Sequence, residues 1–250
     1  MRIIKNIFTT IWRVWAYTMV AVVILLLSPF LLVTSLKESW YRSFFFFARI
    51  WAKVTLFLVG FYYKSENPDA LDPKKSYMLV ANHTSLADIL LMLAVVKNPF
   101  VFVGKKELAK LPLFGYLYKR TCILVDRSSQ KSRMEVFARA QKRIDQGLSI
   151  CIFPEGGVPA DESIVLDIFR DGAFKLAIEH QLPIAPLVFP DNKKRFSYTF
   201  MSGSPGIMRA KLLFPIETSD KTIDDKAAIR AVNESVRQLI YEELIAYNVK

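Results

Sequence analysis

The chain has 250 residues and a formal net charge of +11, and 52% of its residues are hydrophobic. Its pI is about 9.6 and its mean hydropathy is +0.25. A basic nucleic-acid-binding protein is rarely this apolar, so the composition argues against nucleic acid and favours an anionic membrane surface as the partner. Two cysteines, Cys122 and Cys151, lie in apolar strand-like runs and are too few for a disulfide framework or a zinc cluster. We expect reduced core thiols, which suits a domain that lies in the cytoplasm.

The N-terminal segment is apolar and long. Residues 14–36 carry no charge, and residues 22–27 are purely aliphatic. About 20 apolar residues are enough to span a bilayer, so this segment is long enough. Pro29 removes a helical N–H group, and it bends or ends the helix unless neighbours satisfy the freed carbonyl. No small-x-small cleavage site follows, so we predict a retained anchor rather than a secretory signal.

The next stretch, residues 40–63, is rich in aromatic side chains and contains Arg49 and Lys53 on one helical face. This pattern predicts a helix that lies in the membrane interface with its cations toward the headgroups. A second span and a core helix are the alternatives. Because Lys and Arg flank both segments, charge bias leaves two topologies open: one full span, or a shallow hairpin with both ends cytoplasmic. We assign residues 1–64 to an N-terminal membrane anchor and residues 65–250 to one further domain.

After a predicted linker at residues 65–76, strand patterns alternate with helical patterns. Strands are expected at residues 77–81, 100–103, 122–125, 149–153, 184–188 and 211–214. Helices are expected at residues 86–96, 131–146, 172–180 and about 223–247. This alternation predicts an α/β fold with a mostly parallel sheet flanked by helices.

His83 follows the first of these strands, and Asp88 stands five positions later. On a continuous helix this spacing would leave the two side chains about 140° apart. They meet only if His83 lies in the loop and Asp88 in the first helical turn. Ser85 is a suitable N-cap, with Asp88 at the capping-box position. An imidazole held by a carboxylate can act as a base; the alternative is a turn histidine beside a helix-capping aspartate.

Polar residues follow four of the predicted strands. Since ligands bind beyond the carboxyl ends of parallel strands, these junctions are expected to form one site. They supply a base (His83), two cations (Lys105 and Arg127), and the main-chain amides of Gly156 and Gly157, which suit an oxyanion or a phosphate.

These junctions resemble the membrane-bound glycerolipid acyltransferases, specifically the bacterial 1-acylglycerol-3-phosphate O-acyltransferases. Residues 82–88 (Asn-His-Thr-Ser-Leu-Ala-Asp) are similar to the His-x4-Asp block of that family. The blocks that end in Asp-Arg, that read Phe-Pro-Glu-Gly and that form a proline-rich strand are matched in order by residues 122–127, 153–156 and 182–186. Residues 103–108 resemble its lysine-bearing segment. The resemblance covers residues 77–188.

The resemblance implies an enzyme on the cytoplasmic face of the cell membrane. Its acyl donor is acyl carrier protein or coenzyme A thioester, its acceptor is the sn-2 hydroxyl of lysophosphatidic acid, and its product is phosphatidic acid. It implies direct transfer without a metal or a further cofactor. The implied roles are general base for His83, orientation of the base for Asp88, phosphate binding for Lys105 and Arg127, positioning or acceptor contact for Glu155, and oxyanion binding for Gly156 and Gly157.

One block departs from the family pattern. Members continue Phe-Pro-Glu-Gly with Thr-Arg-Ser, whereas Gly157-Val158-Pro159 stands here. The arginine at that place is associated with the acceptor's phosphate, which Val158 cannot bind. Lys105, Arg127 and Arg170 remain for a phosphate, and a lyso-amino-lipid is the alternative acceptor.

Other polar residues receive simpler interpretations. His180 is expected to cap the C-terminus of its helix, and residues 193–195 (Lys-Lys-Arg) to form a solvated turn, with a headgroup contact as the alternative. A metal hydrolase would need more ligands than His83 and Asp88. A membrane-tethering protein without catalytic activity would not need four polar strand ends.

Overall fold

The structure is a computed structural model that describes residues 2–110, 114–126, 128–159, 161 and 163–248. It begins with helix α1 (Arg2–Ser35), the 3-10 turn η1 (Glu38–Trp40) and helix α2 (Tyr41–Val59). The elements that follow are β1 (Phe61–Glu66), β2 (Met78–Ala81), α3 (Ala87–Val95), β3 (Phe100–Lys105), η2 (Lys106–Lys110), α4 (Phe114–Thr121), β4 (Ile123–Val125), α5 (Gln130–Ile144), β5 (Ser149–Ile152), α6 (Gly172–Glu179), β6 (Ile184–Val188), α7 (Asn192–Phe196), β7 (Gly206–Leu212) and α8 (Lys226–Asn248).

The strands form one seven-stranded sheet in the order β1-β7-β6-β2-β5-β3-β4. All neighbours are parallel except β6 and β7, where Leu187 lies opposite Leu212. The predicted α/β fold with a mostly parallel sheet is therefore confirmed. Because β2 to β6 all point the same way, their carboxyl ends meet at one edge, which is where the polar junctions lie.

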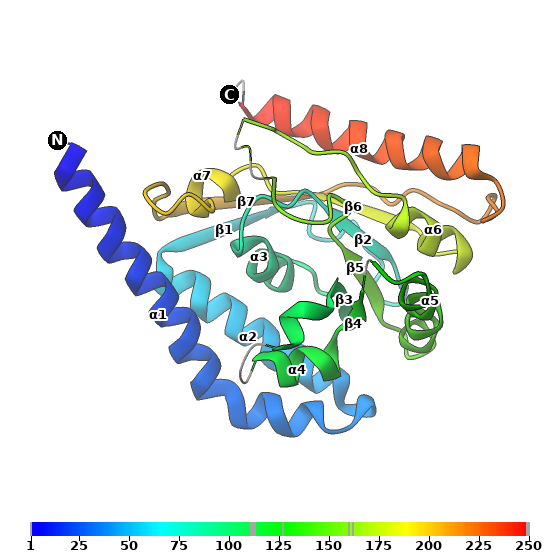
Figure 1. Cartoon of the computed structure of the whole chain (residues 1–250), viewed down its shortest axis with the longest axis horizontal. Helices are drawn as coiled ribbons and strands as arrows, with labels where there is room; N and C mark the ends of the chain where they lie inside the picture. The colour runs from blue at the N-terminus through cyan, green and yellow to red at the C-terminus, as the bar shows by residue number, and fades with distance from the viewer. Residues whose placement is uncertain (1, 111–113, 127, 160, 162, 249–250) are drawn as a thin grey trace.

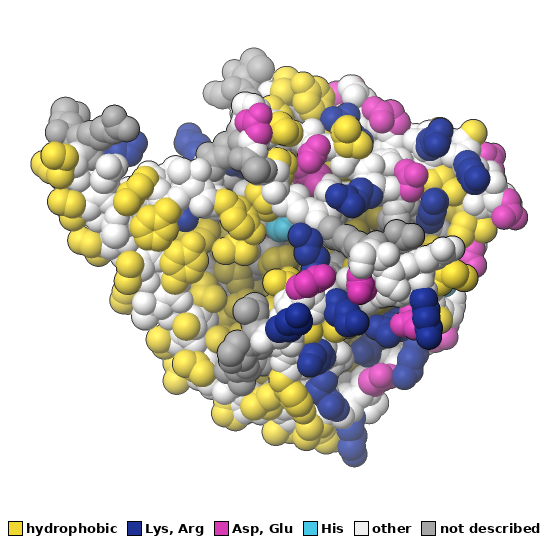
Figure 2. All heavy atoms as spheres, in the orientation of Figure 1, with side chains coloured by type: hydrophobic (Ala, Val, Ile, Leu, Met, Phe, Trp, Pro, Cys, Tyr) yellow, Lys and Arg dark blue, Asp and Glu magenta, His cyan; other side chains and the backbone are white. Residues whose placement is uncertain are grey.

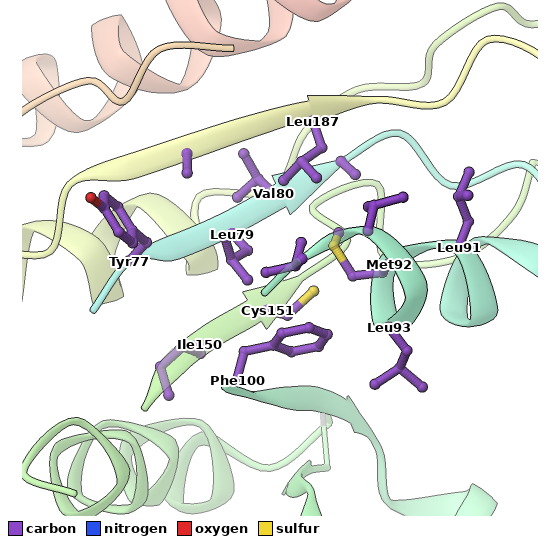
Figure 3. Close-up of a cluster of buried hydrophobic side chains, with 14 of the residues drawn as sticks. Tyr77, Leu79, Val80, Leu91, Met92, Leu93, Phe100, Ile150, Cys151 and Leu187 are labelled. Atoms are coloured by element: carbon purple, nitrogen blue, oxygen red, sulfur yellow. The ribbon is translucent and has the colours of Figure 1, made fainter. Parts of the chain in front are cut away.

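The sheet is covered on both faces. Helices α6 and α8 lie over one face, and α2 and α3 lie on the other side (Figure 1). Every residue of β2 is buried, as expected for a central parallel strand covered on both sides. Figure 3 shows Leu79 and Val80 of β2 pointing to opposite sides, with Met92 of α3 beside Cys151 of β5. This core fixes the position of the strand ends that carry the site.

Helix α1 continues through Pro29 rather than ending there. The hydroxyl of Ser28 donates to the carbonyl of Leu25 (2.7 Å), the group that Pro29 leaves without its helical partner. Residues Ile3–Ser35 are long and apolar enough to cross a membrane. Hydrophobic side chains gather over α1 in Figure 2, and the exposed ones include Ile4, Phe8, Ile11, Val14, Leu25, Leu26, Phe30 and Val33.

Helix α2 packs against the sheet domain. The Tyr41 hydroxyl donates to the carbonyl of Phe100 (2.8 Å), and Ala52 and Leu56 are fully buried. The prediction that Arg49 faces lipid headgroups is wrong. Its guanidinium donates to the carbonyls of residues 93 and 94 (3.1 and 3.3 Å) at the end of α3, because a helix C-terminus presents unpaired carbonyls and attracts a cation.

Three stretches differ from the sequence prediction. The predicted domain boundary between residues 64 and 65 falls inside β1, which pairs in parallel with β7 from Phe61–Gly206 to Glu66–Lys211. Strand β7 begins at Gly206, earlier than the expected residue 211, and residues 193–195 lie in α7 instead of a solvated turn.

Candidate active site

His83 lies in the loop after β2, and Asp88 lies in the first turn of α3. The His83 Nδ1 atom is 2.8 Å from Asp88 Oδ2. The carboxylate is completely buried, whereas 17% of the histidine side chain is exposed. The loop-and-turn arrangement expected from the five-residue spacing is thus the one that the backbone adopts. This arrangement holds the partly exposed imidazole of His83 against the buried carboxylate of Asp88.

Asp88 is held by hydrogen bonds on both oxygens. Oδ2 accepts from the main-chain N–H groups of Thr84 (2.7 Å) and Ser85 (2.9 Å), and Oδ1 accepts from Asn192 Nδ2 (2.6 Å). Together with His83 Nδ1, these donors satisfy a buried carboxylate without a metal or an arginine. The expected capping box is half formed: Asp88 reaches back to Ser85 N, while Ser85 Oγ donates to the carbonyl of Phe196 (2.5 Å).

The ring of His83 is fixed from two further directions. It stacks on Phe153 with ring centroids 4.4 Å apart, and the main-chain N–H of His83 donates to Glu155 Oε1 (2.5 Å). Because Asp88 occupies Nδ1, the proton on the neutral ring resides there, and Nε2 is left as the nitrogen that takes a proton from a substrate. The site is therefore arranged for general-base chemistry.

Glu155 connects two loops of the site. Its Oε1 accepts from His83 N, and its Oε2 accepts from Asp167 N (2.9 Å). The side chain is buried, and this burial raises the pKa of the carboxyl although both hydrogen bonds act to lower it. Since both oxygens are engaged with the main chain, the geometry supports the positioning role for Glu155 rather than an acceptor contact.

Lys105, at the end of β3, lies beside the glycine turn that follows β5. Gly156 adopts a left-handed conformation (φ 81°), and its N–H donates to the carbonyl of Phe153 (3.1 Å). The expected oxyanion donor at Gly156 is therefore already engaged in the turn, which favours the N–H of Gly157. The Lys105 ammonium lies 3.7 Å from the place that a Cβ would take at Gly157. Arg127, the other predicted cation, lies outside the described residues.

A cavity of about 250 Å³ lies against Thr84, the residue that follows His83 in the chain. It is lined by Thr84, Val158, Pro159, Ile164, Lys193, Tyr198 and Thr199. A second cavity of about 400 Å³ shares Thr84 and Lys193 with it. Thr84 is 7% exposed, and its Oγ1 has no hydrogen-bond partner within the described part of the chain.

Two residues of this region are not among the predicted site residues, although a headgroup contact is the alternative given above for Lys193. Asn192 holds Asp88, and Lys193 lines both cavities, with its ammonium donating to the carbonyl of Ile164 (3.0 Å). Both follow β6, whose carboxyl end lies at the same sheet edge as the four junctions that were considered. The signal that identifies them is their position after a predicted parallel strand.

The second histidine lies at the opposite edge of the sheet. His180 is the C-cap residue of α6, as expected, and its Nδ1 lies 2.7 Å from Gln141 Oε1. Burial lowers its pKa, although the neighbouring carboxylates of Glu179 and Asp145 act to raise it. No group of three or more His, Cys, Asp or Glu residues in the described ranges is arranged to hold a metal ion.

The chain was compared with known proteins. The acyltransferase family model matches residues 63–190. An uncharacterized acyltransferase of Schizosaccharomyces pombe is 31% identical over 67% of this chain and 61% of that protein. The mouse 1-acyl-sn-glycerol-3-phosphate acyltransferase alpha is 31% identical over 66% of this chain and 57% of that protein. The chain thus spans about three fifths of these relatives.

The fold has a close counterpart among solved structures. The crystal structure of the 1-acyl-sn-glycerophosphate (LPA) acyltransferase PlsC of Thermotoga maritima superposes with a TM-score of 0.78, at 19% identity, over 100% of this chain and 99% of that chain. The family model covers the strands and loops that carry His83, Asp88, Lys105 and Glu155. The chain therefore belongs to the acyltransferase family.

Proposed function

We propose that the protein is a 1-acylglycerol-3-phosphate O-acyltransferase, which moves a fatty acyl group from a thioester to the sn-2 hydroxyl of lysophosphatidic acid and forms phosphatidic acid. The single observation that carries the proposal is the dyad. Asp88 is fully buried, accepts four hydrogen bonds and holds Nδ1 of His83, so Nε2 is directed to take a proton. Family membership and the names of the relatives support acyl transfer to this acceptor.

The reaction needs no acyl-enzyme. His83 Nε2 takes the proton of the acceptor hydroxyl as its oxygen forms a bond to the thioester carbonyl carbon. Asp88 stabilises the imidazolium that forms. When the tetrahedral intermediate collapses, the carbon–sulfur bond breaks, and the imidazolium returns the proton to the thiolate. The N–H of Gly157 is our candidate donor to the oxyanion.

Two lysines support a negatively charged acceptor. Lys105 lies beside Gly157, and Lys193 lines the cavity whose wall includes Val158. We propose that these ammonium groups bind the phosphate of the acceptor while its hydroxyl faces His83. Val158 also leaves the alternative of a lyso-amino-lipid, whose carboxylate would use the same lysines.

We propose that the enzyme works on the cytoplasmic face of the cell membrane, with α1 in or through the bilayer. The exposed apolar face of α1 supports this location. We propose either acyl carrier protein or coenzyme A as the carrier of the acyl group. The proposed reaction needs no further cofactor, since base, oxyanion donor and cations all come from the chain.

The proposal is tested with purified protein in detergent. Lysophosphatidic acid, the corresponding acylglycerol without phosphate and a lyso-amino-lipid are each supplied with acyl carrier protein or coenzyme A thioesters. Mass analysis then identifies the product. Phosphatidic acid should form fastest. Equal kcat/KM for the first two acceptors would refute the phosphate assignment, and preference for the third would establish the alternative acceptor.

The lysines allow a sharper test. Lys193→Met and Lys105→Met should each raise the KM for lysophosphatidic acid by about ten- to a hundredfold, because a hydrogen bond to a charged group contributes about 1.5–3 kcal/mol. The KM for the thioester should stay near the wild-type value. Lys226→Met, at an exposed position at the start of α8, is the matched control. An unchanged acceptor KM in both variants would remove the lysines from the site.

Membrane binding has its own test. Leu26 is 71% exposed on α1. Replacing it with aspartate should weaken sedimentation with anionic vesicles by about tenfold or more, since burying one leucine side chain is worth about 1.5–3 kcal/mol. Leu239→Asp on α8, which lies over the other face of the sheet (Figure 1), should bind vesicles like the wild type. Equal losses in both variants would show that α1 is not the membrane contact.

A further inference from the structure

Helix α1 contains an arginine that faces the protein instead of solvent. Arg13 is 1% exposed. Its Nε donates to the carbonyl of Ser202 (3.0 Å), and its Nη2 lies within hydrogen-bond distance of the carbonyls of Ser202 (2.7 Å), Ser197 (2.8 Å) and Thr199 (2.9 Å). The guanidinium also lies over the ring of Phe196, 4.6 Å from its centroid. One side chain of α1 thus binds three main-chain carbonyls of the loop at residues 197–203.

That loop forms part of the walls of both cavities that Thr84 and Lys193 line. Tyr198 and Thr199 line the smaller cavity, and Ser197, Ser202 and Gly203 line the larger one. The segment between α7 and β7 contains no helix or strand, and within it the Thr199 carbonyl also accepts from the N–H of Ser202 (3.1 Å). Arg13 supplies the hydrogen bonds that connect three of its carbonyls to α1. The conformation of the cavity wall therefore depends on a residue of the apolar N-terminal helix.

The contact continues from this loop to the catalytic pair. Phe196 ends α7, and its carbonyl accepts the hydroxyl of Ser85. Asn192 begins α7 and donates to Asp88 (2.6 Å). Trp12 packs edge-on against Phe196, with centroids 5.7 Å apart. Helix α7 is thus hydrogen-bonded to the dyad region and packs against α1 through the ring of Phe196.

Anchoring alone does not account for this arrangement. A helix that only holds a protein on a membrane needs apolar side chains, and a buried guanidinium is costly unless its donors are satisfied. The acceptors named here are all main-chain carbonyls of the cavity wall. An arginine with a planar fork of donors suits this task better than lysine, whose ammonium is a compact point charge.

We propose that Arg13 is a positioning residue that holds residues 197–203 as the wall of the acceptor cavity, so that α1 shapes the acceptor site as well as binding the membrane. This inference rests on the proposed function for the identity of the acceptor. It predicts that loss of Arg13 impairs the acceptor's fit more than the donor's, and does so in detergent, where no membrane is available for anchoring.

The experiment uses the full-length protein with Arg13→Met and Arg13→Lys, and with Lys5→Met, at an exposed position of α1, as the matched control. Amide hydrogen exchange is first measured for the peptide that covers residues 197–204. In wild type, the N–H groups of Thr199, Ser202 and Ser204 are hydrogen-bonded. Their exchange should be faster in Arg13→Met, intermediate in Arg13→Lys and unchanged in Lys5→Met, with exchange in β2 and β5 unaltered.

The kinetic constants of the same variants are then measured in detergent. Arg13→Met should lower kcat/KM for lysophosphatidic acid by about tenfold or more, since a misplacement of about 1 Å in a site can cost about 10²-fold. The KM for the thioester should change little, and Arg13→Lys should recover part of the activity. Unchanged exchange in residues 197–204 overturns the inference, as does an equal rise of both KM values. If wild-type protein does not acylate lysophosphatidic acid, the proposed function fails, while the exchange result still decides the role of Arg13.

Discussion

Replacing His83 with alanine should lower kcat by about 10²–10⁴-fold, because this is the usual contribution of a positioned general base. His83 is the only described residue that brings an imidazole to the polar edge of the sheet, and Asp88 commits its Nδ1. Its main-chain N–H, rather than its side chain, bonds Glu155, so the loop keeps that contact in the variant. The acceptor KM should therefore change much less than kcat.

The chain offers a matched control, since its other histidine is distant from the site. His180→Gln keeps a polar group near Gln141 at the opposite edge of the sheet and should retain near wild-type turnover. Thermal unfolding of both variants shows that each is folded. Turnover above about a tenth of wild type in folded His83→Ala would be incompatible with a base contribution of about 10²-fold or more, and the mechanism would have to be abandoned.

Replacing Asp88 with asparagine should also lower kcat by about two to four powers of ten. Removing one partner of a buried ion pair costs about 3–5 kcal/mol, and the pair of His83 imidazolium and Asp88 forms only as the proton is taken. The substitution removes the charge of Asp88 but keeps its hydrogen bonds to the loop. The N–H groups of Thr84 and Ser85 require an oxygen at the Oδ2 position, so the new carbonyl still accepts from Nδ1 of His83.

The remaining amide nitrogen of that variant faces Asn192. In the wild type, Asn192 Nδ2 donates to Asp88, and Asn192 Oδ1 is buried without a partner in the described ranges. Rotation of the Asn192 amide presents that oxygen to the new donor, so the variant should fold. Asp191→Asn is the control, because Asp191 is a buried carboxylate whose partner is Arg209 and not His83. A kcat loss in Asp88→Asn no larger than in this control would contradict the role assigned to the charge.

The parts of the site that could be predicted from the sequence are those encoded by local spacing. His83 and Asp88 lie five residues apart across a strand-loop-helix junction, and this short separation leaves few geometries that bring them together. Asn192 reaches Asp88 only because β6 lies beside β2 in the sheet. Strand order depends on packing across the whole domain, so the position of Asn192 after a predicted strand indicates the edge of the sheet but not its place beside the dyad.

The elements of the fold also differ in how far local sequence patterns predict them. The central strands are continuous apolar runs and were located within a few residues. Strand β1 was missed because it lies at the edge of the sheet and only its first residue, Phe61, is buried. In β7, alternate residues Met208, Ala210 and Leu212 are buried, and the polar residues between them obscured the start of the strand. The role of Arg49 was misjudged because its partners, the last carbonyls of α3, lie far away in the sequence.

The pairing of β1 with β7 has a consequence for biosynthesis. Strand β1 has β7 as its single neighbour, and Phe61 lies opposite Gly206. During translation, α1, α2 and β1 leave the ribosome long before β7 does. Strand β1 therefore has an open edge until one of the last segments is made and completes the sheet. With α1 in or through the bilayer, as we propose, its early membrane contact would keep this unpaired strand away from other unfinished chains.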